Sequence, residues 1–187
     1  KGSSVIGALA KSYKNIESGY YERIEQTSNS VRYRGMLEDG VTVTKHWTIE
    51  DGTDKTAPKL KLIVSFKAAE GKSFELSDYS ITTGSAVGLF EKEQAMQIGW
   101  FYYEDGDYQH EETGEFTGGF FSDKKPVANV TVENIEYFGV DNQFFGTSLF
   151  PQSDSKSTNL WASGKKLNAE SGLWIYNVGL ELPSKSI

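Results

Sequence analysis

The densest set of hard metal ligands lies in residues 104–112 and consists of Glu104, Asp105, Asp107, His110, Glu111 and Glu112. Carboxylate oxygens at this density can hold Ca²⁺. The spacing matches no calcium-binding loop, however, and the Asp105-Gly106 step at its centre is what a tight β-hairpin turn requires. We therefore expect a solvated hairpin here, with a metal site as the alternative.

His46 and His110 are the only histidines, and the chain has no cysteine. A catalytic interpretation would make His46 a general base paired with a carboxylate such as Glu50. No serine or second histidine motif accompanies it, so we expect a surface histidine on a strand and assign no catalytic residue. The missing cysteines exclude disulfides, thiolate nucleophiles and cysteine-ligated zinc. We expect neither a cofactor nor a metal.

The most aromatic stretch is residues 99–103, Gly-Trp-Phe-Tyr-Tyr. Strand alternation sends two of these rings to each face of a sheet. Aromatic side chains on the outer face of a sandwich can stack on sugar rings or contact a protein partner. The candidate binding residues are therefore Trp100, Phe101, Tyr102 and Tyr103. The alternative is that they form core on one face and ordinary surface on the other.

Two further patterns carry little chemistry. Residues 114–122 contain three glycines but no lysine, and they lack the strand–turn–helix context of a phosphate loop. Asn129-Val130-Thr131 matches a glycosylation sequon, which matters only in a eukaryotic secretory route.

The elements that must position these residues are strands. Apolar and polar residues alternate most clearly in residues 41–49, 60–66 and 174–182. Weaker strand candidates are residues 31–37, 74–82, 97–103, 129–140, 143–150 and 158–162. Helix is scarce: residues 5–17 fit either a helix or a strand, and residues 91–97 fit a short helix.

The turns agree with this pattern. Glu-Asp-Gly occurs at residues 38–40, 50–52 and 104–106, and Asp-Gly supplies the positive φ that tight hairpins need. Two of these turns flank residues 41–49 and predict a meander there. Short strands at this spacing predict an all-β, antiparallel sandwich or barrel with minor helix.

Composition and charge bound the class of protein. The 187 residues are 37% hydrophobic and 13% aromatic, which excludes a disordered chain. The net charge is −7, and no basic face is evident, so nucleic acid and anionic lipid are not expected as partners. We see no linker or internal repeat and expect residues 1–187 to form one domain.

The longest apolar run is residues 5–10, far short of the roughly 20 residues that a membrane helix needs. The chain opens on Lys1 and shows no charged-then-apolar leader. We interpret it as an excised fragment of a longer protein.

Residues 136–145, Glu-Tyr-Phe-Gly-Val-Asp-Asn-Gln-Phe-Phe, followed by 149–151, Leu-Phe-Pro, resemble a segment of the YidC insertase family. The motif residues are Gly139, Val140, Asn142, Gln143, Phe144, Phe145 and Pro151. The family usually has a tryptophan near Tyr137 or Phe138, where this chain departs. Residues 39–49, 60–66, 77–84 and 180–183 are similar to other strands of the family, in the same order.

The resemblance covers about residues 31–183 and implies the periplasmic domain of a multi-pass protein of the bacterial inner membrane. It implies an antiparallel β-supersandwich related to galactose-mutarotase-like folds. It also implies a non-enzymatic accessory role in the insertion and folding of membrane proteins, through contacts with Sec translocon components or nascent chains.

Two alternatives from other classes stay open. One is a secreted carbohydrate-binding β-sandwich, which predicts a concave aromatic face. The other is a sugar-modifying, mutarotase-like enzyme, which predicts His46 or His110 within about 3 Å of a carboxylate in a pocket.

Overall fold

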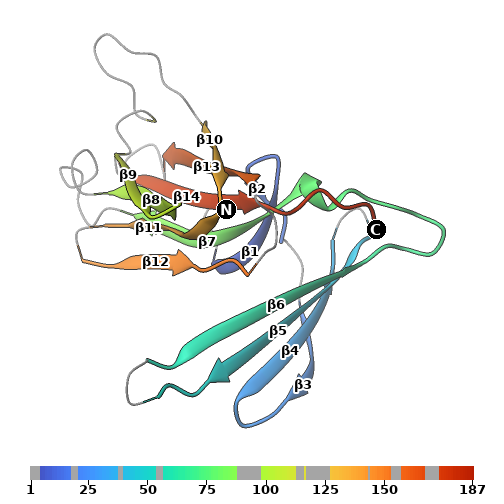
Figure 1. Cartoon of the computed structure of the whole chain (residues 1–187). Helices are drawn as coiled ribbons and strands as arrows, with labels where there is room; N and C mark the ends of the chain where they lie inside the picture. Colours follow the sequence, from blue (N-terminus) through green and yellow to red (C-terminus); the bar gives the residue numbers. More distant parts are fainter. Residues whose placement is uncertain are drawn as a thin grey trace. The chain divides into compact units, whose positions relative to one another are not determined.

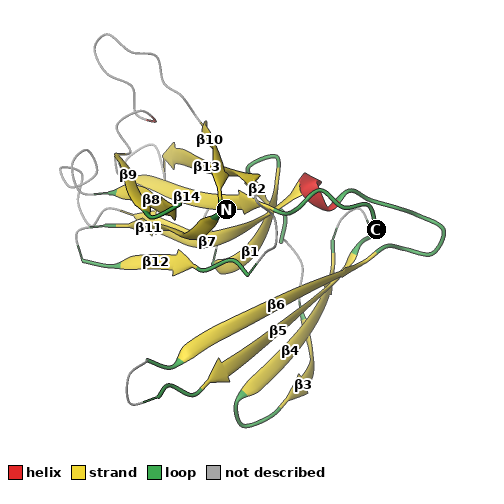
Figure 2. Ribbon diagram, in the orientation of Figure 1, coloured by secondary structure: helices red, strands yellow, loops and turns green. Residues whose placement is uncertain are grey.

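The structure is a computed structural model that describes residues 5–17, 21–37, 40–53, 57–87, 98–112, 116, 127–142, 144–152, 157–166 and 173–187. Nearly all regular structure of the described residues is antiparallel strand, with a 3₁₀ turn at Leu76–Asp78 and a helical assignment at Phe116 (Figures 1 and 2). The predicted all-β, antiparallel class with minor helix is confirmed. The expected short helix at residues 91–97 lies outside the described residues.

Contacts group the chain into two compact units. Unit 1 comprises Lys1–Asn15 and Leu76–Ser184, and unit 2 comprises Ile16–Glu75 and Lys185–Ile187. The expectation of one domain stays a prediction.

Unit 1 contains a large sheet and a small sheet. The large sheet has the strand order β10-β13-β14-β7-β1-β2, and the small sheet has the order β12-β11-β8-β9. The strands are β1 (Ile6–Lys11), β2 (Lys14–Asn15), β7 (Tyr79–Val87), β8 (Gly99–Glu104), β9 (Asp107–Glu112), β10 (Val127–Glu133), β11 (Ile135–Asp141), β12 (Gly146–Leu149), β13 (Ser157–Lys166) and β14 (Trp174–Glu181). Residues 5–17, for which helix and strand were both open, therefore form the β1–β2 hairpin.

The two sheets of unit 1 pack face to face around one core, as a sandwich requires. The small sheet contributes buried side chains from β8 and β11, and the large sheet contributes them from β7, β10, β13 and β14. The core members with the least exposure are Ile98, Phe116, Val132, Phe138, Val140, Leu160, Ala162, Tyr176 and Val178. The sandwich is thus present, and the finer likeness to galactose-mutarotase-like supersandwiches stays a prediction.

Strand β14 shows why alternation understates burial in a central strand. The sequence predicts a single apolar face, yet Ile175 and Tyr176 point to opposite faces and both are buried. Strand β14 lies between β13 and β7, so neither of its edges is free. Backbone pairing on both sides and packing on both faces therefore bury most of its residues.

Residues 129–140 are predicted as one strand, and this expectation is wrong. Asn134 has a positive φ of 46° and separates β10 of the large sheet from β11 of the small sheet. The Asn134 side chain donates a hydrogen bond to Asp105 Oδ1 at 2.7 Å, and the backbone N–H of Glu133 donates to Glu104 Oε2 at 2.9 Å. The tip of the β8–β9 hairpin therefore fixes the point where the chain changes sheets. The predicted strand at residues 74–82 also differs from the structure, because β7 begins only at Tyr79.

Unit 2 contains one four-stranded sheet in the order β3-β4-β5-β6, a simple meander as the turns predicted. Its strands are β3 (Glu22–Gln26), β4 (Ser30–Met36), β5 (Thr42–Glu50) and β6 (Lys59–Lys67). Val43 on β5 is fully buried, and it shares its face with Lys45 and Trp47. Strand β3 was not predicted, because its sequence Glu-Arg-Ile-Glu-Gln has only one apolar residue.

Candidate functional site

The small sheet separates the four candidate aromatic residues as alternation predicts. Trp100 and Tyr102 point into the sandwich and are only 5% and 6% exposed, so their predicted place on an aromatic surface is wrong. Phe101 and Tyr103 lie half-buried on the outer face. Burial raises the pKa of Tyr102, and the nearby charges of Glu104 and Glu111 raise it further.

Phe101 and Tyr103 belong to a larger group of rings on that outer face, which we call the aromatic band. Its members are Phe101, Tyr103, Tyr108, Tyr137 and Phe150. The register places Tyr137, Tyr103 and Tyr108 side by side across β11, β8 and β9, and Phe150 follows β12 next to Tyr137. Tyr108 is 52% exposed and Phe150 is 68% exposed. The band therefore presents contiguous aromatic surface to solvent.

The rings of the aromatic band stand against one another. Tyr103 and Tyr137 are nearly parallel, with 9° between their planes and 5.2 Å between their centroids. Phe101 meets Tyr137 edge to face at 6.2 Å, and Phe150 meets it at 5.4 Å. This geometry is an offset stack, so Tyr103 and Tyr137 each turn one face toward the other.

His110 lies at the margin of the band. Its Nε2 is 3.3 Å from Asp141 Oδ1, and both side chains are partly exposed at 39% and 31%. The ring of His110 also stacks beside Tyr108, with 6.3 Å between centroids. Burial raises the pKa of Tyr108 most. The charge of Asp141 and the neighbouring Tyr137 raise it further. This histidine–carboxylate pair lies on the sheet surface rather than in a pocket.

The acidic cluster forms the expected hairpin. Asp105 and Gly106 are its two turn residues, with φ values of 49° and 90°, and they join β8 to β9. Positive φ at both positions is the signature of a type I′ turn, which Asp-Gly suits. Among the residues that the structure describes, no group of three or more His, Cys, Asp or Glu side chains is arranged to hold a metal ion.

The motif residues of the YidC resemblance lie in and after β11. Gly139 and Val140 are in β11, and Asn142 begins the turn to β12. The Asn142 side chain accepts hydrogen bonds from the N–H groups of Phe144 and Phe145, at 2.9 and 2.8 Å. Phe144 and Phe145 are exposed beside the band's strands, and Pro151 follows Phe150. Gln143 lies outside the described residues.

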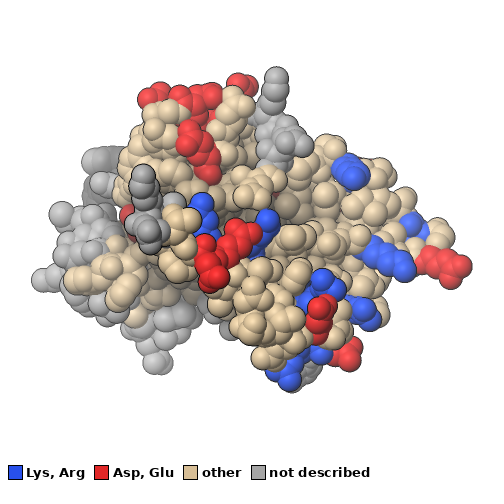
Figure 3. Space-filling model, turned by 60° about the horizontal axis from the view of Figure 1, so that its bottom comes forward, with Lys and Arg blue, Asp and Glu red and all other residues tan. Residues whose placement is uncertain are grey.

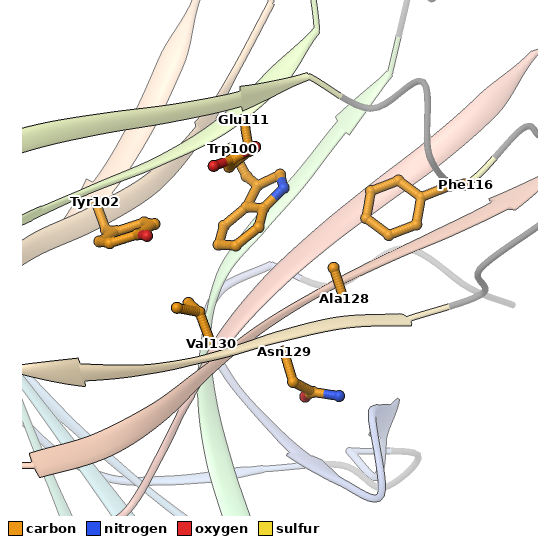
Figure 4. A pocket seen from close by; sticks show the side chains of 7 residues that line it. All are labelled: Trp100, Tyr102, Glu111, Phe116, Ala128, Asn129 and Val130. Atoms are coloured by element: carbon orange, nitrogen blue, oxygen red, sulfur yellow. The ribbon is translucent and has the colours of Figure 1, made fainter.

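A hollow of about 190 Å³ opens on the inner side of the small sheet (Figure 4). Trp100 and Tyr102, stacked at 5.7 Å, line it together with Phe116, Ala128 and Val130, and Glu111 and Asn129 lie at its margin. Small-molecule sites commonly enclose about 300–1,000 Å³. The hollow is smaller than that range, so the outer aromatic band is the stronger candidate site.

Unit 2 holds a buried charged cluster that the sequence patterns did not predict. Lys45 is 6% exposed, and its ammonium group forms an ion pair with Glu17. The hydroxyl of Tyr21 donates to the same Glu17 oxygen at 3.0 Å, and Lys45 Nζ lies 5.1 Å from the centre of the Tyr21 ring. Burial lowers the pKa of Lys45, and the charge of Glu17 opposes this shift. The sequence did contain one indication that Lys45 is buried, because this residue occupies a position on the apolar face of β5.

His46 lies on the polar face of β5, across from Arg32 on β4 and Ile63 on β6. It is half-buried there, as expected of a histidine on a solvated strand face. Asn129 of the sequon is exposed on β10, while only Phe116 of the glycine-rich segment 114–122 is described.

Comparisons with known proteins give no assignment. No protein-family model matches the chain, and no curated protein matches it significantly. The likeness to the YidC family therefore rests on the motifs quoted above. Within the part of the chain that the structure describes, no helix has the length and apolar character of a membrane span.

Proposed function

We propose that this chain is a non-catalytic binding module that holds a polypeptide partner on the aromatic band of the small sheet. The observation that carries the proposal is the contiguous exposed aromatic surface, with Tyr108 and Phe150 each more than half exposed. Contiguous apolar patches of this kind commonly mark interaction sites. Aromatic side chains also supply much of the binding energy in protein interfaces.

The ring geometry favours a polypeptide over a glycan. A sugar ring stacks on an open aromatic face. Tyr103 and Tyr137 each turn one ring face toward the other instead of toward solvent. Phe150 and Phe101 further enclose Tyr137. A polypeptide can instead pack apolar side chains between and beside upright rings, so the carbohydrate-binding alternative is less well supported.

The YidC resemblance suggests a specific form of this function. In that form, the module lies on the periplasmic side of the bacterial inner membrane and contacts Sec translocon components or nascent membrane proteins. It assists insertion and folding without catalysing a reaction. The support is the order of the quoted motifs, together with a sandwich that carries an exposed aromatic band.

Site-specific photo-crosslinking in the parent protein and its native membrane tests both forms. A photoreactive residue at Phe150 should crosslink to a polypeptide, and one at Met36 of unit 2, which is 71% exposed, is the control. Crosslinks to Sec components or nascent chains at Phe150 alone would support the insertase role. Equal crosslinking at both positions would contradict a specific site. Heat released by a glycan in calorimetry, and abolished by Phe150→Ala, would favour the carbohydrate-binding alternative.

A further inference from the structure

Strand β9 is an edge of the small sheet. It pairs with β8 and with no other strand among the described residues. In an antiparallel pair, every second residue of an edge strand turns its N–H and C=O away from its neighbour. The side chains of residues 107–111 are all exposed. Strand β9 thus has the geometry of a site for strand addition.

The charge on the strands of the small sheet is of one sign. Its four strands contain no lysine or arginine, and their acidic residues are Glu104, Asp107, Glu111, Glu112, Glu136 and Asp141. Figure 3 shows a group of acidic side chains at the top of the view, with no lysine or arginine of the described residues among them. A basic ligand is therefore attracted to this sheet, and an acidic one is repelled.

The same charges act against pairing between two copies of this chain. If β9 of one molecule lay antiparallel to β9 of another, Asp107 and Glu111 would approach the carboxylates of the second copy. Like charges across a strand pair are destabilising. Acidic residues on an edge strand thus disfavour self-association, while the backbone geometry still admits a strand of opposite charge.

The two faces of β9 define the side chains of such a strand. Tyr108 and His110 lie on the outer face, in line with the aromatic band, and Asp107 and Glu111 lie on the other face. Side chains of an added strand alternate in the same way. Basic residues would therefore meet Asp107 and Glu111, and apolar residues between them would extend the aromatic band beside Tyr108.

We propose that β9 binds an extended basic segment of a partner protein as an additional strand, with lysine or arginine alternating with apolar residues. This inference rests on the proposed function, because it names the chemistry of the polypeptide that the small sheet takes. Backbone hydrogen bonds along β9 align the segment, and the carboxylates select its charge.

Fluorescence anisotropy with short labelled peptides tests the inference on the purified chain. A peptide of alternating arginine and valine should bind, and binding should weaken as ionic strength rises. A peptide of alternating glutamate and valine should not bind. A peptide of alternating arginine and proline keeps the charge but lacks half of the N–H donors, and it should bind about tenfold more weakly. Equal binding of the arginine–proline peptide would overturn strand addition.

Charge reversal on β9 gives the second test. The double variant Asp107→Lys/Glu111→Lys should bind the arginine–valine peptide at least about tenfold more weakly, because two attractive contacts become repulsive. If circular dichroism shows that this variant does not fold, the variant Asp107→Asn/Glu111→Gln takes its place. A smaller loss of affinity for the peptide is then expected. Unchanged affinity in the folded variant would overturn the inference.

The inference and the proposed function fail in different ways. If crosslinking at Phe150 finds a polypeptide while the arginine–valine peptide does not bind, the binding module stands and the basic strand does not. If the peptide binds and protects the amides of β9 from hydrogen exchange, strand addition stands regardless of the crosslinking result.

Discussion

The ring of Phe101 lies directly over Gly139 on the neighbouring strand β11. A Cβ atom at Gly139 would come within 2.3 Å of Phe101 Cζ and 2.4 Å of the Thr147 carbonyl oxygen. The two residues are direct cross-strand partners on the outer face. Glycine at this position lets Phe101 lie close to the sheet between Tyr137 and Tyr108.

Gly139→Ala should destabilise unit 1 by about 2 kcal/mol, because a methyl group cannot fit between Phe101 and the backbone of β12 without displacing one of them. Urea denaturation measures the loss. Gly146→Ala is the matched control in the same sheet, since its Cβ would meet nothing closer than 3.4 Å. Equal losses in the two variants would show that the contact with Phe101 does not limit this position.

Removing the exposed rings should reduce binding rather than stability. Tyr108→Ala and Phe150→Ala should each weaken capture of a polypeptide partner by about tenfold, as expected for aromatic anchors of an interface. Pull-down from membrane extract with quantified crosslinks at Phe144 measures the effect. Met36→Ala removes a similarly exposed apolar side chain from unit 2 and should leave capture unchanged.

The buried pair in unit 2 should respond strongly to loss of one partner. Lys45→Met should destabilise unit 2 by about 3 kcal/mol, because the carboxylate of Glu17 stays buried without its counterion. Trp47 is the one tryptophan of unit 2, so its fluorescence during urea denaturation can report on this sheet.

The double variant Glu17→Leu/Lys45→Met is the control for that interpretation. Removing both charges leaves no unpaired buried ion, so the combined loss should be well below the sum of the two single losses. Additive losses would show that the ion pair is not the source of the effect.

Tyr21 should make unit 2 less stable in alkali. Burial raises the pKa of the Tyr21 hydroxyl well above its ordinary value of 10.0, and the charge and hydrogen bond of Glu17 add to this. Above pH 10 the folded chain therefore retains a proton that the unfolded chain releases, and the free energy of unfolding falls as pH rises. The stabilising contribution of the neutral Tyr21 hydroxyl is fully present below pH 10.

The pKa shift of Lys45 changes stability with pH in the opposite direction. Its pKa is lowered in the folded chain, so the unfolded chain binds more protons. The unfavourable contribution of Lys45 to stability therefore diminishes as pH rises towards the ordinary lysine value of 10.5.

The variant Tyr21→Phe removes only the effect of the tyrosine. Its unfolding free energy should fall less steeply above pH 10 than that of the parent chain, with Tyr33→Phe as the control for loss of a hydroxyl elsewhere in unit 2. Identical slopes in Tyr21→Phe and the parent chain would contradict the assignment.

Local patterns in the sequence were sufficient for much of the fold. Alternation predicted β5, β6 and β14, and Glu-Asp-Gly predicted the hairpin between β8 and β9. That hairpin also fixes Tyr108 opposite Tyr103, because a two-residue turn leaves only one register. This part of the aromatic band could have been predicted from residues 99–112 alone.

Other features depend on pairing between distant parts of the chain. Tyr137 joins the band only because β11 pairs with β8, and nothing local in residues 129–140 shows that the chain changes sheets at Asn134. The burial of Trp100 and Tyr102 similarly depends on the large sheet that covers them. The role of Lys45 depends on Glu17, 28 residues away in the sequence.

The hydrogen bonds from Glu133 and Asn134 to the β8–β9 hairpin have a mechanical consequence. They connect the tip of that hairpin to the junction of β10 and β11. Tension applied at the tip of that hairpin, at Glu104 or Asp105, would therefore pass through this junction into the large sheet.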